Sequence, residues 1–237
     1  MPTADSADAT RALALRVWRQ EPGAEGSLVD YQVEVPPEGM VVDALFALQA
    51  RGDSTLAFRV SCRAGICGSC AVRVDGREQL ACQMPLSLVR DGVRVEPLRH
   101  LPVLRDLVVD LDPFFAKYGA VHPEFRPAPL TEPARVTAAE RGLVERAINC
   151  ISCGACYSAC DMVGLNPDFL GPAALARAWA LAADARDADP DARLAEAVGE
   201  QGAWRCHNLG NCTVVCPKGV APLLAIQALR RRALWRR

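Results

Sequence analysis

The stretch Cys150-Ile-Ser-Cys153-Gly-Ala-Cys156-Tyr-Ser-Ala-Cys160 decides the fold of the second half of the chain. A related stretch, Cys206-His-Asn-Leu-Gly-Asn-Cys212-Thr-Val-Val-Cys216-Pro, follows it. The chain has 11 cysteines in 237 residues, an odd number in tight groups. The polar, acidic first ten residues are unlike a secretory leader, so we expect the chain to lie in the reducing cytoplasm. Cysteines grouped in this way in such a compartment favour metal ligands over disulfides.

The first stretch has the C-x2-C-x2-C-x3-C spacing of bacterial ferredoxins. In two-cluster ferredoxins three of these thiolates bind one cluster and the fourth binds the other. This crossover rule predicts a complete set of four ligands for a [4Fe–4S] cluster, namely Cys150, Cys153, Cys156 and Cys216. The thiolates left for the other cluster are Cys160, Cys206 and Cys212.

Leu209 occupies the middle ligand position when the same template is laid over the second stretch. A leucine side chain has no donor atom, and three thiolates cannot fill four iron sites. The second cluster is therefore expected to be [3Fe–4S].

Four further cysteines lie in the first half, in Cys62-Arg-Ala-Gly-Ile-Cys67-Gly-Ser-Cys70 and at Cys82. C-x4-C-x2-C with one distant cysteine is the spacing of plant-type [2Fe–2S] ferredoxins. A zinc site is the alternative, but zinc ribbons usually have paired C-x2-C knuckles and here there is one pair. Sets of four, four and three account for all 11 cysteines.

The rest of the sequence predicts an α+β chain of two domains. Residues 1–110 read as a small mixed sheet with one helix: strands over 12–19, 31–35 and 93–96, a helix over 41–51 ending at Gly52, and a hairpin at Asp75-Gly76. The proline-rich segment 111–136 reads as a connector. Residues 137–237 read as all-helical, with a capping box at Thr137 and Glu140 and helices over 137–149, 172–183, 190–198 and 222–235.

Charge and hydropathy exclude some functions. The net charge of −1 argues against nucleic acid as the main partner. No apolar run is long enough to cross a bilayer. Five of the last eight residues are arginines, a run that suits either a solvated helix end or anionic lipid headgroups.

A plant-type [2Fe–2S] segment followed by interleaved [4Fe–4S] and [3Fe–4S] motifs resembles the iron–sulfur subunit of succinate dehydrogenase and fumarate reductase (respiratory complex II). The resemblance covers about 13–230, with specific motifs at 61–70, 80–82, 166–174 and 216–219. It implies a β-grasp [2Fe–2S] domain and a ferredoxin-like helical domain. It also implies an FAD-containing flavoprotein partner, membrane-anchor subunits with or without haem b, and menaquinone or ubiquinone as the quinone. The chain would then lie peripherally on the cytoplasmic face of the bacterial inner membrane.

The resemblance also directs attention to residues near the third cluster. Asp161 stands where most of the family has proline, and we expect it to cap a helix, the alternative being a proton relay to the quinone. His207 matches a quinone-site histidine in part of the family, and Arg230 falls where quinol-binding fumarate reductases have a lysine. The tryptophan that contacts quinone in many relatives is missing after Cys160, so the pocket differs in detail.

Two other electron carriers remain as alternatives. Iron–sulfur subunits of other flavin dehydrogenases usually have complete four-iron motifs and no plant-type segment, in contrast to Leu209 and the Cys62–Cys82 region. A free-standing polyferredoxin would carry electrons without a fixed partner, and would purify alone.

Overall fold

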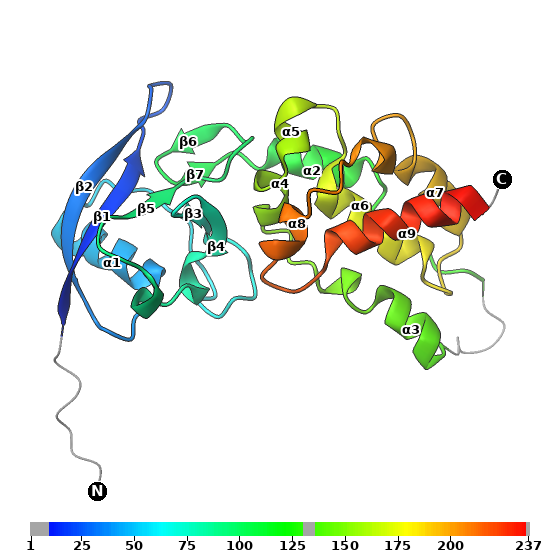
Figure 1. The fold of residues 1–237 in the computed structure, drawn as a ribbon, viewed down its shortest axis with the longest axis horizontal. Coiled ribbons are helices and arrows are strands. Elements are labelled where there is room, and N and C mark those ends of the chain that lie inside the picture. The colour runs from blue at the N-terminus through cyan, green and yellow to red at the C-terminus, as the bar shows by residue number, and fades with distance from the viewer. Residues whose placement is uncertain (1–9, 130–135, 236–237) are drawn as a thin grey trace, which may run out of the picture. The chain divides into compact units, whose positions relative to one another are not determined.

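The computed structural model describes residues 10–129 and 136–235. The chain divides after Asp110 into two compact units, a sheet unit and a helical unit (Figure 1). Among the described residues no helix is both long and apolar enough to cross a membrane.

The first unit is built on a five-stranded sheet in the order β2-β1-β5-β3-β4. Its strands are β1 (Arg11–Arg19), β2 (Ser27–Val35), β3 (Ala71–Val74), β4 (Arg77–Leu80) and β5 (Val93–Glu96). Strand β1 pairs antiparallel with β2 and parallel with β5. Alternate β1 residues Leu13, Leu15 and Val17 are fully buried, as the predicted period of two requires.

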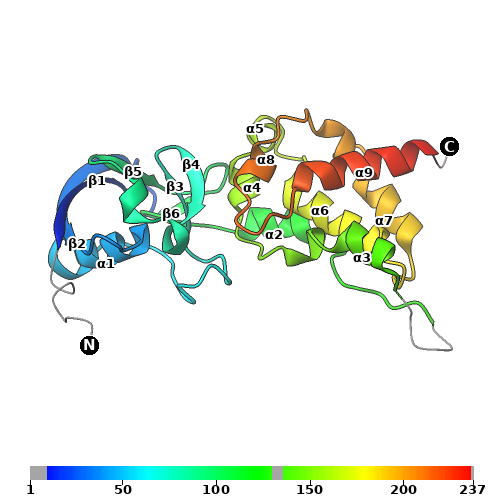
Figure 2. The same cartoon turned by 60° about the horizontal axis from the view of Figure 1, so that its bottom comes forward.

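Helix α1 (Val41–Arg51) covers one face of this sheet (Figure 2). Its buried side is apolar, including Val41, Leu45 and Leu48, and it ends at Gly52 as predicted. The hairpin β3–β4 turns through Asp75 and Gly76, both with positive φ (47° and 81°), which a two-residue hairpin turn of the primed type needs. Two short 3-10 turns follow, Ala81–Gln83 and Leu86–Leu88.

A small hairpin that the sequence did not predict closes the first unit: β6 (Val103–Arg105) and β7 (Val108–Val109). Asp106 at its turn is 1% exposed and accepts hydrogen bonds from Arg19 Nε (3.0 Å), Gln20 N (2.9 Å) and Ala57 N (2.8 Å). These bonds tie the hairpin to the end of β1 and to the segment that leads into the first cysteine loop.

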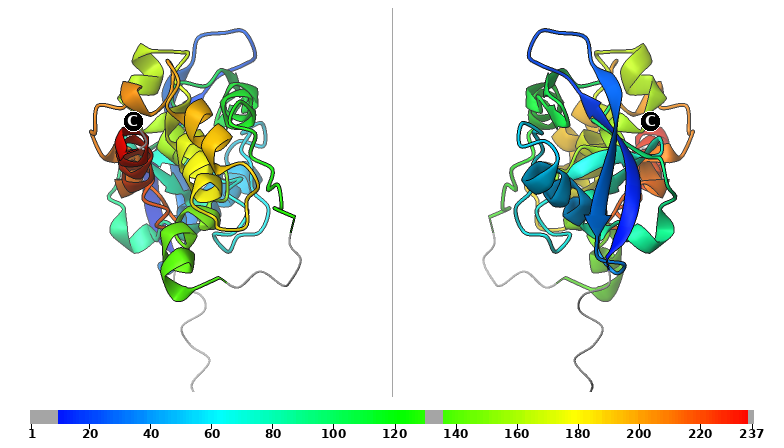
Figure 3. Two further views of the ribbon diagram at one scale, coloured as in Figure 1. Left: turned by 90° about the vertical axis from the view of Figure 1, so that its right-hand side faces the viewer. Right: turned by 90° about the vertical axis from the view of Figure 1, so that its left-hand side faces the viewer.

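The second unit packs around helix α6 (Gly171–Ala182), of which ten of twelve residues are buried. Helices α2 (Asp112–Gly119), α3 (Ala138–Val144), α7 (Pro190–Ala197) and α9 (Pro222–Trp235) contact α6 (Figure 3). The cysteine segments form short elements: α4 (Ala155–Ser158), α5 (Asp161–Leu165), α8 (Asn211–Val214) and the 3-10 turns Ala147–Asn149 and Ala203–Arg205.

Two details of the helical half differ from the sequence-based expectation. The capping box at Thr137 is present, with Glu140 N donating to Thr137 Oγ1 (3.2 Å) and Thr137 N to Glu140 Oε2 (2.8 Å), but α3 ends at Val144 and a separate 3-10 turn follows. The segment 111–136, predicted as a connector, begins with helix α2. Phe114 of α2 is buried edge-on against Tyr157 (ring centroids 5.6 Å apart), so this part of the segment belongs to the helical unit.

Candidate metal centres

The first cysteine loop wraps around the Cys62 sulfur. Backbone N–H groups of Ala64 (3.4 Å), Ile66 (3.3 Å) and Cys67 (3.3 Å) all donate to Cys62 Sγ. This curl needs left-handed backbone at Gly65 (φ 68°), where an added Cβ would also lie 2.9 Å from the Gln83 side chain. Amides pointed at a sulfur stabilise its thiolate form, the form that binds iron.

The four thiols of this unit differ in environment. Cys62 and Cys67 are exposed, whereas Cys70 and Cys82 are buried. Hydrogen bonds from Ser69, and then from Cys62, lower the pKa of Cys67 to about 6. Burial, together with the neighbouring Cys82 and Cys67, raises the pKa of Cys70 to about 12. The structure therefore brings together the four cysteines that the spacing grouped. Sequence reasoning missed the hydrogen bond from Ser69, although this residue stands between two predicted ligands, Cys67 and Cys70, in the sequence.

A second group surrounds one cavity in the helical unit. The cavity is lined by Cys150, Cys153, Cys156 and Cys216 together with apolar side chains such as Phe114 and Val220. Burial is the main reason that the pKa of Cys153 rises to about 11, with smaller contributions from Cys150 and Cys216. These are the four cysteines that the crossover rule assigned to one cluster.

The remaining three cysteines form a third group. The pKa of Cys212 is raised to about 11, mainly by burial and then by the nearby Cys160 and Cys206. Burial likewise raises the pKa of Cys160, and Cys206 and Asp161 raise it further. No cysteine is left outside the three groups, and all 11 are free thiols.

The two stretches of the helical unit repeat one backbone conformation. Ser152 (φ 52°) and Asn208 (φ 58°) are both left-handed, and each donates its N–H to the first sulfur of its stretch, Cys150 Sγ (3.5 Å) or Cys206 Sγ (3.4 Å). A left-handed glycine then precedes a four-residue helix in each case, Gly154 before α4 and Gly210 before α8. In this repeat, the residue between the two left-handed positions is Cys153 in one stretch and Leu209 in the other. Leu209 thus stands at the place of a ligand.

The other predicted site residues lie near the third group. His207 and Leu209 are exposed beside Cys206. Asp161 is the first residue of α5, whose N-cap is Cys160, so the expectation that Asp161 caps this helix is corrected. Arg230 on α9 reaches the 203–208 segment, where its Nε and Nη2 donate to Ala203 O.

The thiols fit iron–sulfur clusters as resident groups. Buried thiols with raised pKa values need a positive centre to become thiolates, and cluster irons supply it. In the described part of the chain no three Cys, His, Asp or Glu side chains are placed to hold a single metal ion. Thiolates around a cluster surround a multi-iron group and do not converge on one ion.

Comparisons with known proteins match each of the two units to a family of iron–sulfur domains. Residues 14–116 match the model of a 2Fe-2S iron-sulfur cluster binding domain, and residues 146–220 match a 4Fe-4S dicluster domain. The fumarate reductase iron-sulfur subunit of Mycobacterium tuberculosis is 40% identical over 93% of this chain and 92% of its own length. The succinate dehydrogenase iron-sulfur subunit of Paracoccus denitrificans is 36% identical over 97% of this chain and 90% of its own. The chain belongs to this family of iron–sulfur subunits.

A solved structure extends the likeness to three dimensions. The fold is similar to a chain of the Mycobacterium smegmatis Sdh1 complex in the apo form, with a TM-score of 0.88, 32% identity, and coverage of 97% of this chain and 98% of that one. The predicted family and the predicted α+β architecture are therefore confirmed. This iron–sulfur subunit is an electron-transfer component of complex II with [2Fe–2S], [4Fe–4S] and [3Fe–4S] clusters.

Proposed function

We propose that this chain relays single electrons between the FAD of a flavoprotein subunit and a quinone held at membrane-anchor subunits. The observation that carries the proposal is the grouping of 11 thiols into sets of four, four and three, with Leu209 at the place of the absent twelfth. Bound clusters supply reversible one-electron redox chemistry. The chain itself binds them, shields them and sets their potentials.

The ligand sets follow the three groups. The [2Fe–2S] cluster is assigned to Cys62, Cys67, Cys70 and Cys82; the [4Fe–4S] cluster to Cys150, Cys153, Cys156 and Cys216; the [3Fe–4S] cluster to Cys160, Cys206 and Cys212. The left-handed turns at Ser152 and Asn208 support equivalent roles for the two stretches. Losing one iron and one thiolate changes the charge of the third cluster, which makes Leu209 a device that sets its potential.

The exposure of each unit suits a different partner. In the sheet unit, Cys62 and Cys67 are exposed and Ile66 between them is 64% exposed, so a flavoprotein surface can approach the cluster loop closely. In the helical unit, four large apolar residues that lie within a few positions of the three thiols in the sequence are exposed, namely Leu165, Trp204, Leu209 and Val214. Exposed apolar side chains of this kind suit an apolar anchor subunit.

The quinone pocket is assigned to the surface beside Cys206. His207 is exposed there, and we propose that it hydrogen-bonds a quinone oxygen. Asp161 lies beside Cys160 and is the candidate for moving protons to that oxygen. Exposed Trp235 at the end of α9 suits a membrane interface, and we place the subunit peripherally on the cytoplasmic face of the membrane.

Low-temperature EPR with iron and sulfide analysis of the purified complex tests the proposal. We expect about nine irons per chain, from clusters of two, four and three irons, and a three-iron signal in the oxidised sample. The chain should co-purify with a flavoprotein and an anchor. Bound zinc, far fewer irons, or a chain that purifies alone would each contradict the proposal.

A further inference from the structure

The guanidinium of Arg230 is bound to the loop that carries Cys206. Arg230 Nε and Nη2 donate to Ala203 O at 2.9 and 2.6 Å, and Nη2 also donates to Cys206 O. Nη1 lies 3.4 Å from Asn208 Oδ1, and the guanidinium lies over the Trp204 ring, 5.6 Å from its centroid. All three nitrogens of one side chain on α9 thus contact the 203–208 segment.

These contacts occupy most of the donors of Arg230. A guanidinium has five N–H groups on its three nitrogens; the Nε group, both Nη2 groups and one Nη1 group face acceptors of the protein, which leaves one Nη1 N–H. The next two arginines of α9 differ: Arg231 is exposed, and Arg232 donates to Ala182 O in α6. Of the three arginines that the structure describes at the end of α9, only Arg230 therefore donates to the Cys206 loop.

The loop that Arg230 holds has a backbone that needs support. Asn208 is left-handed (φ 58°), and its N–H donates to Cys206 Sγ. A left-handed non-glycine residue costs free energy and persists only where its surroundings fix it. By fixing the carbonyl groups of Ala203 and Cys206 and the side chain of Asn208, Arg230 fixes where the Cys206 sulfur and the Asn208 amide lie.

We propose that Arg230 is a positioning residue for the three-thiol centre, which it holds through the Cys206 loop. This inference rests on the proposed function, because it takes Cys206 as a cluster ligand. Lysine cannot replace the arginine fully, since a single ammonium group cannot span the separate acceptors at 203, 206 and 208.

The test uses the purified complex with Arg230→Gln, Arg230→Lys and, as matched control, Arg231→Gln on the exposed neighbour. EPR of the three-iron cluster, its midpoint potential and its rate of loss in a chelator are measured beside the KM for quinone. The [2Fe–2S] signal of the other unit serves as the internal reference for folding and loading. Loss of partners outside the ligand shell commonly weakens metal affinity roughly 10- to 100-fold.

We expect Arg230→Gln to speed chelator-driven loss of the three-iron signal by roughly tenfold or more and to shift its potential, with the [2Fe–2S] signal unchanged. Arg230→Lys should lie between Arg230→Gln and the wild type, and Arg231→Gln should match the wild type. An unchanged three-iron signal and potential with a raised quinone KM in both Arg230 variants would overturn this inference alone. A wild-type complex without a three-iron signal would overturn the proposed function as well.

Discussion

Arg193 and Asp187 form an ion pair whose side chains are 1% and 0% exposed, with Nη2 and Oδ2 3.4 Å apart. Arg193 also donates to the carbonyl oxygens of His122 and Glu124 (2.7 Å for Glu124), so α7 is fastened to the segment that follows α2. A buried charge left without its partner is costly.

Arg193→Met should therefore destabilise the protein by about 3–5 kcal/mol, because it leaves the Asp187 carboxylate buried and unpaired. Urea unfolding followed by circular dichroism measures the loss. Arg16→Met, which breaks the exposed pair with Asp30, is the control and should cost less than about 1 kcal/mol. Equal losses for the two variants would show that the buried pair has no special role.

Leu209→Cys should convert the three-iron cluster toward [4Fe–4S] and slow quinone reduction, because the new thiol stands where Cys153 stands in the other stretch. Leu209 is 57% exposed, so folding should not suffer. Low-temperature EPR together with iron analysis decides the outcome. An unchanged three-iron signal in the variant would mean that position 209 is not a ligand position.

Asp106→Ala should destabilise the sheet unit by about 3 kcal/mol or more, since it leaves the N–H groups of Gln20 and Ala57 without their acceptor and removes a partner of Arg19. Asp106→Asn keeps one acceptor oxygen and should cost less. Urea unfolding of both variants gives the comparison. A loss of less than about 1 kcal/mol in Asp106→Ala would contradict the claim that the hydrogen bonds of Asp106 stabilise the sheet unit.

Gly202→Ala should disrupt the entry to the Cys206 loop, because the added Cβ would lie 2.1 Å from Ala197 O, a backbone atom that has little freedom to move. Overpacking of this kind commonly costs about 1–3 kcal/mol or more. The three-iron signal and the thermal midpoint should both fall. Gly199→Ala is the control, since its Cβ would meet Glu196 O at an ordinary 3.4 Å; similar losses in both variants would refute the steric explanation.

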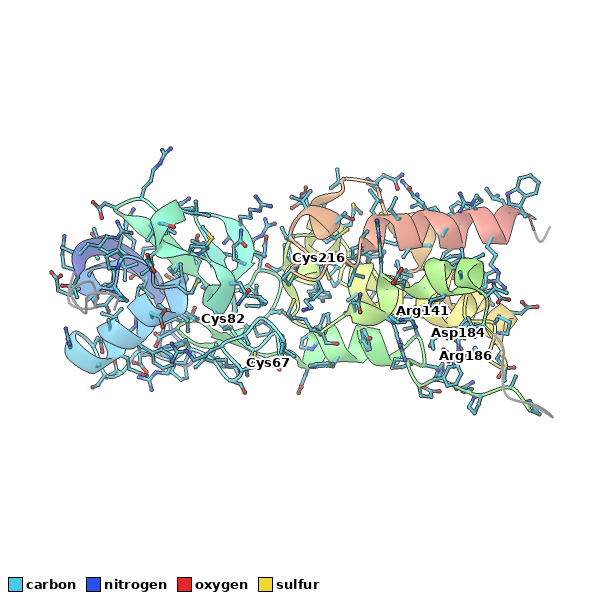
Figure 4. The ribbon with its side chains drawn as sticks, turned by 90° about the horizontal axis from the view of Figure 1, so that it is seen from below. Cys67, Cys82, Arg141, Asp184, Arg186 and Cys216 are labelled. Atoms are coloured by element: carbon cyan, nitrogen blue, oxygen red, sulfur yellow. The ribbon has the colours of Figure 1, made fainter. Side chains whose placement is uncertain are left out.

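Acid should weaken a contact beside α3. Hydrogen bonds from Arg186 (2.9 and 2.7 Å) hold the pKa of Asp184 below its usual range, with a smaller contribution from Arg141 (Figure 4). A lowered folded-state pKa means that the stabilisation is complete above the unfolded pKa of about 4 and is lost as the pH falls toward the folded value. Between pH 7 and pH 3, the free energy of unfolding should fall less in Asp184→Asn than in the wild type. The difference between the two losses should be under about 1 kcal/mol. Parallel profiles would contradict this assignment.

The sequence alone predicted the cysteine groups, a missing ligand at Leu209 and the main helices and strands. These features are local: ligand spacing, a capping box at Thr137 and the turn at Asp75-Gly76 each depend on residues a few positions apart. The β6–β7 hairpin and α2 were not predicted, because Asp106 and Phe114 are fixed by partners distant in sequence, such as Arg19 and Tyr157.

Only the tertiary structure decided what Arg230 does. By position it was a candidate for the quinone pocket, but its acceptors lie 22 to 27 residues earlier in the chain. Packing of α9 against the helical unit brings them within reach. The hydrogen-bond partners of a long side chain depend on which elements pack together. The spacing of residues in the sequence does not predict that packing.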